Sequence, residues 1–353
     1  MSEPILGPDA TVRDAVQMIE QTRRLIAVIV DVDGRLLGIL SDGDIRRALL
    51  AGLGLQSAAA TAMTRNPIVV SSAAAPEEWL ALMIERGVNA VPVVDAEGRF
   101  VHVVQTFDFT DAQRVWTGGQ GFAAAVIMAG GEGRRLLPVT LDRPKPMIDI
   151  GGVPLLERQV RAMARGGLKR IFIATNYLGH VIEDHFGAGS EWGVEIIYLR
   201  EPRQLGTAGA LSLLPQAPAG PLLVINGDVL TTVDFGKLLQ FHNETRAFIT
   251  VAATMHRVAI PFGVLRLDGD RAIAIEEKPS ESYLCNAGIY ALDPQAVSLV
   301  PSDRRIDMTD VVGDAITLGR RVSVFPIHEY WADIGSPGDL KQVLRDFTTV
   351  PLT

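Results

Sequence analysis

The sequence predicts an α/β protein in which a mostly parallel, doubly wound sheet follows a smaller α+β unit. Three observations predict this fold class. Residues 123–128 form an unbroken apolar run, which is typical of a strand buried on both faces of a parallel sheet. Strand-like and helix-like segments then alternate, which favours parallel strands joined by helical crossovers. An internal repeat of a different kind precedes both.

The chain has 353 residues, more than one hydrophobic core usually serves, so we expect more than one domain. The predicted parts are a repeat module at 1–112, a linker at 113–121 and an α/β domain at 122–353. The linker prediction rests on three glycines that come just before the apolar run, because glycine loosens a connecting segment.

Composition excludes several classes of protein. The formal net charge of -8 argues against a nucleic-acid-binding protein, which would carry a basic face. No apolar run is long enough for a transmembrane helix, and the start at Ser2 and Glu3 lacks the features of a signal peptide. The single cysteine, Cys285, cannot form a disulfide within the chain. We therefore expect a cytoplasmic protein with no nucleic-acid partner and no membrane partner.

Each copy of the repeat is predicted to contain two strands joined by a turn, after an amphipathic helix. In the first copy, Thr11 and Asp14 form a capping-box pattern at the start of the helix. The predicted elements that follow are strands at 25–30 and 36–40 and a helix at 45–50 in the first copy, and strands at 90–94 and 100–104 in the second.

In the second domain the predicted elements alternate in type. Glycines 166 and 167 end the first helix, as glycine commonly does. The predicted strands are 123–128, 170–174, 195–199, 222–225 and 248–253, and the predicted helices are 155–164, 179–186 and 208–214. Ligands of such a sheet bind beyond the carboxyl ends of its strands.

A glycine-rich segment follows the apolar strand at 123–128. Gly130, Gly131 and Gly133 allow the backbone to approach a phosphate chain and direct N–H groups at it. Arg135 and Lys145 then supply positive charge. The segment lacks the third glycine of a dinucleotide-binding fingerprint and the Gly-Lys-Ser/Thr of a P-loop.

The string from Gly131 through Pro138 and Thr140 to Pro144-Lys145-Pro146 resembles the signature of the sugar-phosphate nucleotidyltransferases. The resemblance covers residues 122–347 and implies a GT-A-like, Rossmann-like fold. It also implies transfer of a nucleoside monophosphate from a nucleoside triphosphate to a sugar 1-phosphate, with release of pyrophosphate. The nucleophile is already an anionic oxygen, so this chemistry needs positive charge and in-line positioning more than a general base.

The resemblance assigns roles to individual residues. Arg135 corresponds to a ligand of the β- and γ-phosphates, and Lys145 to a contact with the transferring phosphate. Asp228 and Asp333 match the positions that hold Mg²⁺, a cation that prefers carboxylate and phosphate oxygens. The expected ligands of the sugar phosphate are Gly263, Glu277, Lys278 and Asn286, with Lys278 contacting the phosphate as a third catalytic cation.

The predicted base-binding loop contains Glu201, Gly206 and Thr207. Relatives that use UTP or dTTP carry glutamine at the place of Glu201. A carboxylate only accepts hydrogen bonds, and guanine presents two adjacent donors, N1–H and the N2 amine. We therefore favour GTP, with a uridylyl-, thymidylyl- or cytidylyltransferase as the alternative.

The repeat resembles a tandem CBS pair, and the segment from Gly38 to Arg46 carries the closest match. The resemblance implies an adenine-nucleotide site (AMP, ADP or ATP) with Ser41 near a phosphate and Asp44 on a ribose. In the second copy His102 replaces the glycine and Gln105 the hydroxyl residue, although Asp108 remains. The alternative is a packing or dimerisation module in which both aspartates cap helices.

A CBS pair joined to such a transferase domain resembles the glucosamine-1-phosphate guanylyltransferases, and the transferase domain alone also resembles mannose- and heptose-1-phosphate guanylyltransferases. The favoured function is transfer of GMP to glucosamine 1-phosphate by a homo-oligomer, with a dimer favoured. A rival of another class is a non-catalytic regulator that senses nucleotide. The presence of all five charged residues, Arg135, Lys145, Asp228, Lys278 and Asp333, argues against that rival.

Overall fold

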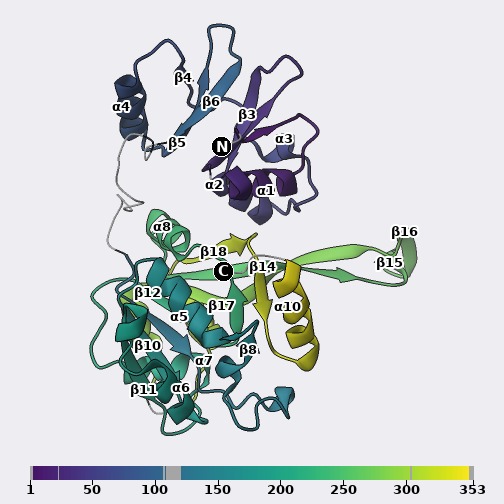
Figure 1. Cartoon of the computed structure of the whole chain (residues 1–353). Coiled ribbons are helices and arrows are strands. Elements are labelled where there is room, and N and C mark those ends of the chain that lie inside the picture. Colours follow the sequence, from purple (N-terminus) through teal and green to yellow (C-terminus); the bar gives the residue numbers. More distant parts are fainter. Residues whose placement is uncertain (1–2, 23, 106–107, 109–120, 303, 350–353) are drawn as a thin grey trace. The chain divides into compact units, whose positions relative to one another are not determined.

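The computed structural model describes residues 3–22, 24–105, 108, 121–302 and 304–349 (Figure 1). The chain divides into two compact units, Met1–Gly118 and Gly119–Thr353. The predicted linker 113–121 lies outside the described residues, apart from Gly121.

The N-terminal unit contains two three-stranded sheets with the same topology. In each, the first two strands are parallel and the last two are antiparallel. The first copy comprises β1 (Ile5–Leu6), α1 (Val12–Thr22), β2 (Ile26–Val30), β3 (Leu36–Ser41), α2 (Asp42–Leu50) and α3 (Ala59–Ala62). The second comprises β4 (Val70–Ser71), α4 (Pro76–Arg86), β5 (Ala90–Val94) and β6 (Phe100–Gln105). The predicted repeat is therefore present, with β1 and β4 as strands that the sequence pattern did not indicate.

The two copies are joined through their turns. The Leu36 amide donates to the Gly98 carbonyl at 3.1 Å, and the Phe100 amide donates to the Gly34 carbonyl at 2.9 Å. The strand registers also make two positions equivalent, since Gly38 pairs with Ile29 and His102 with Val93. A Cβ on Gly38 would lie 2.7 Å from the Thr64 carbonyl oxygen, so the first copy requires glycine there.

A seven-stranded sheet forms the centre of the C-terminal unit, in the order β11-β10-β7-β12-β17-β14-β18 (Figure 1). Its strands are β7 (Ala124–Met128), β10 (Arg170–Thr175), β11 (Glu195–Arg200), β12 (Leu222–Asn226), β14 (Ile249–Ala259), β17 (Ser280–Leu292) and β18 (Val322–Ile327). Only β17 runs antiparallel to its neighbours in this sheet. The chain leaves β7 toward β10 and β11 and returns on the other side at β12, which creates a switch point beside β7.

Helices cover both faces of this sheet, so the predicted doubly wound fold is confirmed. Ala125 and Ile127 of β7 pack with α5 (Leu155–Arg165), α6 (Gly179–Phe186) and α8 (Phe235–Thr245). Ala124 and Val126 pack with α7 (Gly206–Gly209), η5 (Ala210–Leu213), η6 (Pro294–Leu299) and α9 (Met308–Thr317) on the opposite face. This alternation explains the unbroken apolar run in the sequence. Within the described part of the chain, no helix has the length and apolarity needed to cross a membrane.

A third, smaller hydrophobic cluster lies beside the sheet. It joins elements that are far apart in the sequence: η2 (Arg134–Leu136), β8 (Asp149–Ile150), the start of α5, β13 (Val229–Thr231), β19 (Trp331–Asp333) and α10 (Pro337–Thr349). The short elements η3 (Lys145–Met147) and β9 (Val153–Pro154) flank its members in the sequence. Its buried members are Leu136, Ile148, Ile150, Leu155, Leu230, Ile334 and Val343, each at most 5% exposed.

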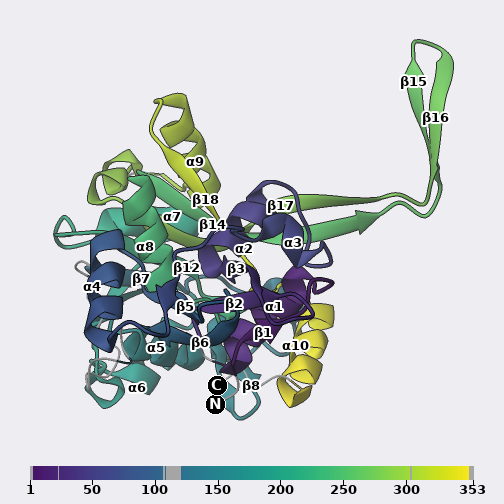
Figure 2. The ribbon, with the colours of Figure 1, turned by 90° about the horizontal axis from the view of Figure 1, so that it is seen from above.

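The outer parts of β14 and β17 leave the sheet and continue into a hairpin of β15 (Gly263–Asp268) and β16 (Arg271–Glu277). Figures 1 and 2 show this hairpin extending away from the rest of the C-terminal unit. The predicted strand at 248–253 is thus only the inner part of a longer strand that ends at Ala259.

Candidate active site

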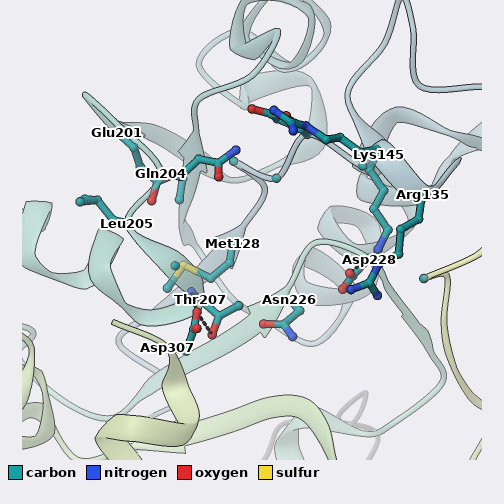
Figure 3. Close-up of a pocket in the computed structure, with 18 of the residues that line it drawn as sticks. Met128, Arg135, Lys145, Glu201, Gln204, Leu205, Thr207, Asn226, Asp228 and Asp307 are labelled. Atoms are coloured by element: carbon teal, nitrogen blue, oxygen red, sulfur yellow. Dashed lines mark hydrogen bonds and ion pairs between the residues drawn. The ribbon is translucent and has the colours of Figure 1, made fainter. Parts of the chain in front are cut away.

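A cleft of about 600 Å³ opens at the carboxyl ends of β7 and β12, where the switch point predicts a ligand site. Its two ends differ in chemistry (Figure 3). Arg135, Lys145 and Asp228 lie at one end, and Glu201 and Gln204 lie at the other. The cleft therefore brings together the predicted phosphate-binding and base-binding residues.

Neighbouring groups restrict side chains at two of the three glycines of the loop that lines the cleft. Gly133 has a φ of +63°, and a Cβ there would lie 2.9 Å from the Cβ of Lys145. The Thr140 hydroxyl donates to the Gly133 carbonyl at 2.9 Å and fixes the turn. A Cβ on Gly130 would collide with the Glu201 carboxylate, whereas one on Gly131 would meet nothing within 4 Å.

The two adjacent arginines of the loop differ in their partners. Arg134 is ion-paired with Glu132 through its Nε. Arg135 has no ion-pair partner among the described residues, and its side chain lines the same cleft. Its guanidinium therefore has its charge and donors available for a ligand, and its fork matches phosphate oxygens.

Asp228 and Asp333 are brought together by a pair of short strands. β13 and β19 are antiparallel, with Val229 opposite Asp333, and the Ile334 amide donates to the Asp228 carbonyl at 3.0 Å. Lys145 Nζ lies 2.5 Å from Asp228 Oδ2 and 4.0 Å from Asp333 Oδ1. Burial, followed by the charge of Asp228, raises the pKa of Asp333 above its usual value.

The carboxylate pair has the properties of a divalent-cation site. Asp228 Oδ1 is buried and has no hydrogen-bond partner in the described structure. The neighbouring Asp333 carboxylate experiences like-charge repulsion, which a bound cation would relieve. Two hard oxygen donors beside a phosphate-sized cleft suit Mg²⁺, which binds through one or two carboxylates plus phosphates and waters.

At the other end of the cleft, Glu201 lies half-buried after β11. Burial raises the pKa of its carboxyl group to about 7, and the Leu205 backbone amide opposes that shift. Oε1 is buried without a hydrogen-bond partner in the described structure. The side chain is therefore a buried acceptor in need of a donor, which a ligand can supply.

Gly206 and Thr207 are held against a second segment, which the sequence analysis missed. The Thr207 amide donates to Asp307 Oδ1 at 2.9 Å, and the Met308 amide donates to the Thr207 hydroxyl at 2.9 Å. Gly206 has a φ of +86°, and a Cβ there would lie 2.5 Å from the Ile306 carbonyl oxygen. The Asp307-Met308-Thr309-Asp310 pattern signals the start of α9 but not a place in the cleft.

Other cleft residues that the sequence analysis did not assign include Met128, Gln204, Asn226 and Arg305. Asn226 ends β12, and its Oδ1 is buried without a partner in the described structure. The sequence signal for Asn226 was its position at the end of a strand, two residues before Asp228. Arg305 lies in a segment with no recognisable pattern of its own.

The predicted sugar-phosphate ligands are not among the residues that line the cleft. Gly263 and Glu277 face each other on the β15–β16 hairpin, and Lys278 follows immediately. Asn286 is on β17, where its amide Nδ2 donates to the Tyr290 hydroxyl at 2.6 Å. Gly263, Glu277 and Lys278 are thus on or beside the hairpin, whereas Asn286 accepts from the amide of Gly288, and a Cβ on Gly288 would lie 2.6 Å from Nδ2 of the cleft residue Asn226. The roles of all four residues remain predictions.

In the N-terminal unit, Asp44 is buried and both of its carboxylate oxygens are engaged. Ser41 caps α2 and donates to Asp44 Oδ2 at 2.6 Å, while Thr64 and Arg47 donate to Oδ1. Asp108 accepts from the Gln105 amide at 2.9 Å and forms an ion pair with Arg24 at 3.1 Å. Each of these aspartates thus has an observed structural role, and nucleotide binding at Ser41, Asp44 and Asp108 remains a prediction.

A mostly parallel sheet with a glycine loop, basic side chains and a carboxylate pair at one carboxyl edge defines a nucleotide-binding α/β protein. Comparison with protein families gives the particular class. The family described as nucleotidyl transferase matches residues 124–349, more than half of the chain, and the CBS domain matches residues 1–51 and 59–114. The chain belongs to the nucleotidyl transferase family and carries a pair of CBS domains at its N-terminus.

The curated relatives share this part of the chain. The mannose-1-phosphate guanylyltransferase of Mycobacterium tuberculosis is 34% identical over 227 residues, which are 61% of this chain and 62% of the relative. The mannose-1-phosphate guanyltransferase of Yarrowia lipolytica is 32% identical over 222 residues, 61% of each chain. The chain thus spans less than two thirds of the length of these relatives.

Among solved structures, HddC from Yersinia pseudotuberculosis resembles the C-terminal unit. It has a TM-score of 0.50 and 26% sequence identity, and the match covers 64% of this chain and 99% of HddC. The similarity agrees with the fold described above.

Two glycines of the loop make a matched pair for mutagenesis. We expect Gly133→Ala to lower the melting temperature and the activity, because it combines a left-handed backbone, costing roughly 1–2 kcal/mol, with a collision against Lys145. Gly131→Ala keeps its backbone N–H and meets no atom within 4 Å, so its melting temperature should stay close to that of the wild type. Equal effects of both substitutions would contradict this account of the loop.

Proposed function

We propose that the protein transfers a nucleoside monophosphate from a nucleoside triphosphate, with GTP as the donor, to a sugar 1-phosphate. One observation carries the proposal: Arg135, Lys145, Asp228 and Asp333 converge on one cleft whose far end holds Glu201. The names of the relatives, which are guanylyltransferases acting on a sugar 1-phosphate, support the same reaction.

The reaction requires an oxygen of the sugar phosphate to attack the α-phosphorus of the triphosphate. The bond from that phosphorus to the bridging oxygen of the β-phosphate breaks, and pyrophosphate leaves. Arg135 would bind the β- and γ-phosphates and stabilise the charge that builds on the leaving group. Lys145 would contact the α-phosphate, and the backbone amides at Gly130 and Gly131 would orient the triphosphate in line with the acceptor.

Mg²⁺ is the proposed cofactor, held by Asp228 and Asp333. The buried, unpartnered Oδ1 of Asp228 supports this assignment, because a buried carboxylate oxygen without a donor is costly. When bound, the cation would neutralise phosphate charge at this end of the cleft. Lys145 is ion-paired with Asp228 and would contribute positive charge beside the cation at the same end of the cleft.

Glu201 is the proposed determinant of base choice. Its carboxylate can accept from both N1–H and the N2 amine of guanine. The unpartnered Oε1 supports a ligand donor at this position. Because burial alone disfavours the charged form, the ionised carboxylate gains most from two aligned donors.

The acceptor sugar has two candidates. The joined CBS pair and transferase domain favour glucosamine 1-phosphate, by resemblance, whereas the relatives are named for mannose 1-phosphate. The test is a cross-screen of both sugars, with heptose and glucose 1-phosphates, against GTP, UTP, dTTP and CTP with and without Mg²⁺. We expect Mg²⁺-dependent pyrophosphate release with GTP. A preference for UTP would overturn the role of Glu201, and no release with any pair would overturn the proposed activity.

Arg134 and Arg135 are a matched pair for testing the phosphate site. We expect Arg135→Ala to lower kcat/KM by on the order of 10²–10³, because it removes an uncommitted donor to the leaving group. Arg134→Ala removes a guanidinium already paired with Glu132, so kcat/KM should change by only a few-fold. Steady-state pyrophosphate release measures both, and a larger loss for Arg134→Ala would reverse the assignment.

Glu201 makes nucleotide binding depend on pH. The carboxyl group must be ionised to accept from guanine, so GTP affinity should rise as the pH increases through about 7. In Glu201→Gln the affinity should be lower at pH 8 and its residual pH dependence should come from the phosphates alone. Calorimetry at pH 6, 7 and 8 compares the two proteins, with ITP, which lacks the N2 amine, as a second ligand. Identical pH profiles would refute the assignment.

Adenine-nucleotide regulation through the CBS pair is a separate proposal that rests on the resemblance around Ser41 and Asp44. Binding of AMP, ADP or ATP would have to compete with the contacts that Ser41, Thr64 and Arg47 make with Asp44. We expect a rise in melting temperature with at least one of the three nucleotides. The absence of any shift and of any change in rate would leave the pair with a structural role.

A further inference from the structure

A two-residue turn carries Asp228 into the cleft. β12 ends at Asn226 and β13 begins at Val229, so only Gly227 and Asp228 connect the two strands. Asn226 and Asp228 both line the cleft (Figure 3), and each has a buried side-chain oxygen without a hydrogen-bond partner in the described structure. The directions of these two side chains depend on how the backbone of the turn is held.

Backbone hydrogen bonds hold the turn on two sides. The Gly227 amide donates to the Met128 carbonyl at 2.9 Å, and the Ile334 amide donates to the Asp228 carbonyl at 3.0 Å. A Cβ on Gly227 would lie 2.8 Å from the same Met128 oxygen, so the turn is in close contact with the end of β7. These contacts tie the turn to β7 and to the residue that follows β19.

A buried side chain of α5 holds the same turn on a third side. Gln159 is 4% exposed, and its Nε2 donates to the Asn226 carbonyl at 3.0 Å and to the Val229 carbonyl at 2.6 Å. A carboxamide has two N–H donors, so both are used on the two residues that flank Gly227 and Asp228. We call this pair of hydrogen bonds the Gln159 clamp, because it spans the turn and joins its two ends to one group.

The acceptor atom of the same carboxamide has no partner. Gln159 Oε1 is buried without a hydrogen bond in the described structure. An unpartnered buried oxygen costs free energy, and an apolar side chain in this place would avoid that cost. The neighbouring residues on the buried face of α5, Leu156, Val160 and Met163, are apolar and belong to the main core. Departures of this kind from ordinary core composition are expected where a functional site has to be held.

We propose that Gln159 is a positioning residue for the metal site, and that its clamp on the turn sets the direction of the Asp228 carboxylate. The inference rests on the proposed function, in which Asp228 is a ligand of Mg²⁺. Gln159 is not among the described residues that line the cleft, so it acts through the backbone of the turn. Groups that orient a metal ligand from behind change metal affinity or activity by about 10–100-fold when they are removed.

The first variant removes the two donors and keeps the length of the side chain. Gln159→Met has no N–H group, and methionine is unbranched and adaptable. The matched control is Met163→Ala, one helical turn further along the same buried face. Because α5 leads to the amino end of β10, Met163 lies farther from the carboxyl edge of the sheet and from the turn. Both variants should fold with a lowered melting temperature, and only Gln159→Met loses the clamp.

Metal binding separates the two variants without any activity. Electron paramagnetic resonance of free Mn²⁺ measures the affinity of the protein for this probe, and Asp228→Asn identifies the binding that belongs to the cleft. We expect Gln159→Met to weaken the Asp228-dependent binding by on the order of 10-fold, and Met163→Ala to leave it within about twofold of the wild type. Equal affinities of the wild type and Gln159→Met would overturn the proposal, as would an equal loss in both variants.

Rescue by Mg²⁺ is the second readout. In Gln159→Met the Mg²⁺ concentration that gives half of the maximal rate should rise about 10-fold, and saturating Mg²⁺ should restore most of kcat, because Asp228 is displaced and not removed. A merely structural defect would lower the rate at every Mg²⁺ concentration, and that result would contradict the proposal.

A second variant keeps the test decisive if Gln159→Met does not fold. Gln159→Asn retains both donors, but it is one methylene shorter and cannot span the two carbonyls, so it should shift the Mn²⁺ affinity and the Mg²⁺ dependence in the same direction. An unchanged metal dependence in Gln159→Asn would then refute the role of the clamp.

The two readouts separate the inference from the proposed function. A wild type that releases pyrophosphate with Mg²⁺, together with Gln159 variants of the same metal dependence, would refute the role of Gln159 alone. A wild type that binds Mn²⁺ through Asp228 and transfers no nucleotide would refute the proposed reaction, and the Mn²⁺ affinities would still decide the role of Gln159. A wild type with neither Asp228-dependent Mn²⁺ binding nor a Mg²⁺ requirement would refute the metal assignment and the inference together.

Discussion

The small hydrophobic cluster beside the main sheet is the constraint on which the active site depends. Each charged residue at the phosphate end of the cleft is close in sequence to a buried member of this cluster: Leu136 follows Arg135, Ile148 lies three residues beyond Lys145, Leu230 two beyond Asp228, and Ile334 follows Asp333. Four loops that would otherwise be independent therefore share one packed support. Burial of apolar surface in this cluster offsets the free-energy cost of holding these charged residues close together.

This arrangement also explains why the charged residues can be so exposed and still well positioned. Arg135 and Asp333 face solvent, whereas their chain neighbours Leu136 and Ile334 are at most 1% exposed. The pairing of β13 with β19 then sets the spacing of the two aspartates through backbone hydrogen bonds rather than through side chains. The backbone thus supplies the spacing of the two aspartates, and it does so without using their carboxylates.

Much of the fold and one half of the site could be predicted from the sequence. The apolar run at β7 and the alternation of strands and helices predicted the sheet because burial on both faces leaves a clear pattern. The glycine loop was predictable because glycine is favoured where the backbone approaches a neighbouring residue closely, as at Gly130, and where φ is positive, as at Gly133. Asp307 was not predictable, because its place in the cleft depends on a backbone contact between Gly206 and Ile306 that leaves no local pattern.

The β15–β16 hairpin shows a different limit of sequence patterns. Alternating residues in β15 and β16 indicate strands, but the pattern does not say whether either face is covered by the rest of the unit. The resemblance placed Glu277 and Lys278 at a sugar phosphate, and the structure places them on a projecting hairpin. Sequence similarity thus indicates a chemical role for these residues without indicating where the fold places them.

The two CBS copies differ in the space available for a side chain at the equivalent positions Gly38 and His102. In the first copy, Ile39 and Thr64 exchange two backbone hydrogen bonds of 3.0 and 2.8 Å, and the strand passes so close that Gly38 cannot acquire a side chain. The equivalent His102 in the second copy lies with its ring 5.7 Å from that of Trp79, edge to face. The connecting segment therefore leaves no room for a side chain at position 38, whereas the equivalent position in the second copy accommodates an aromatic ring.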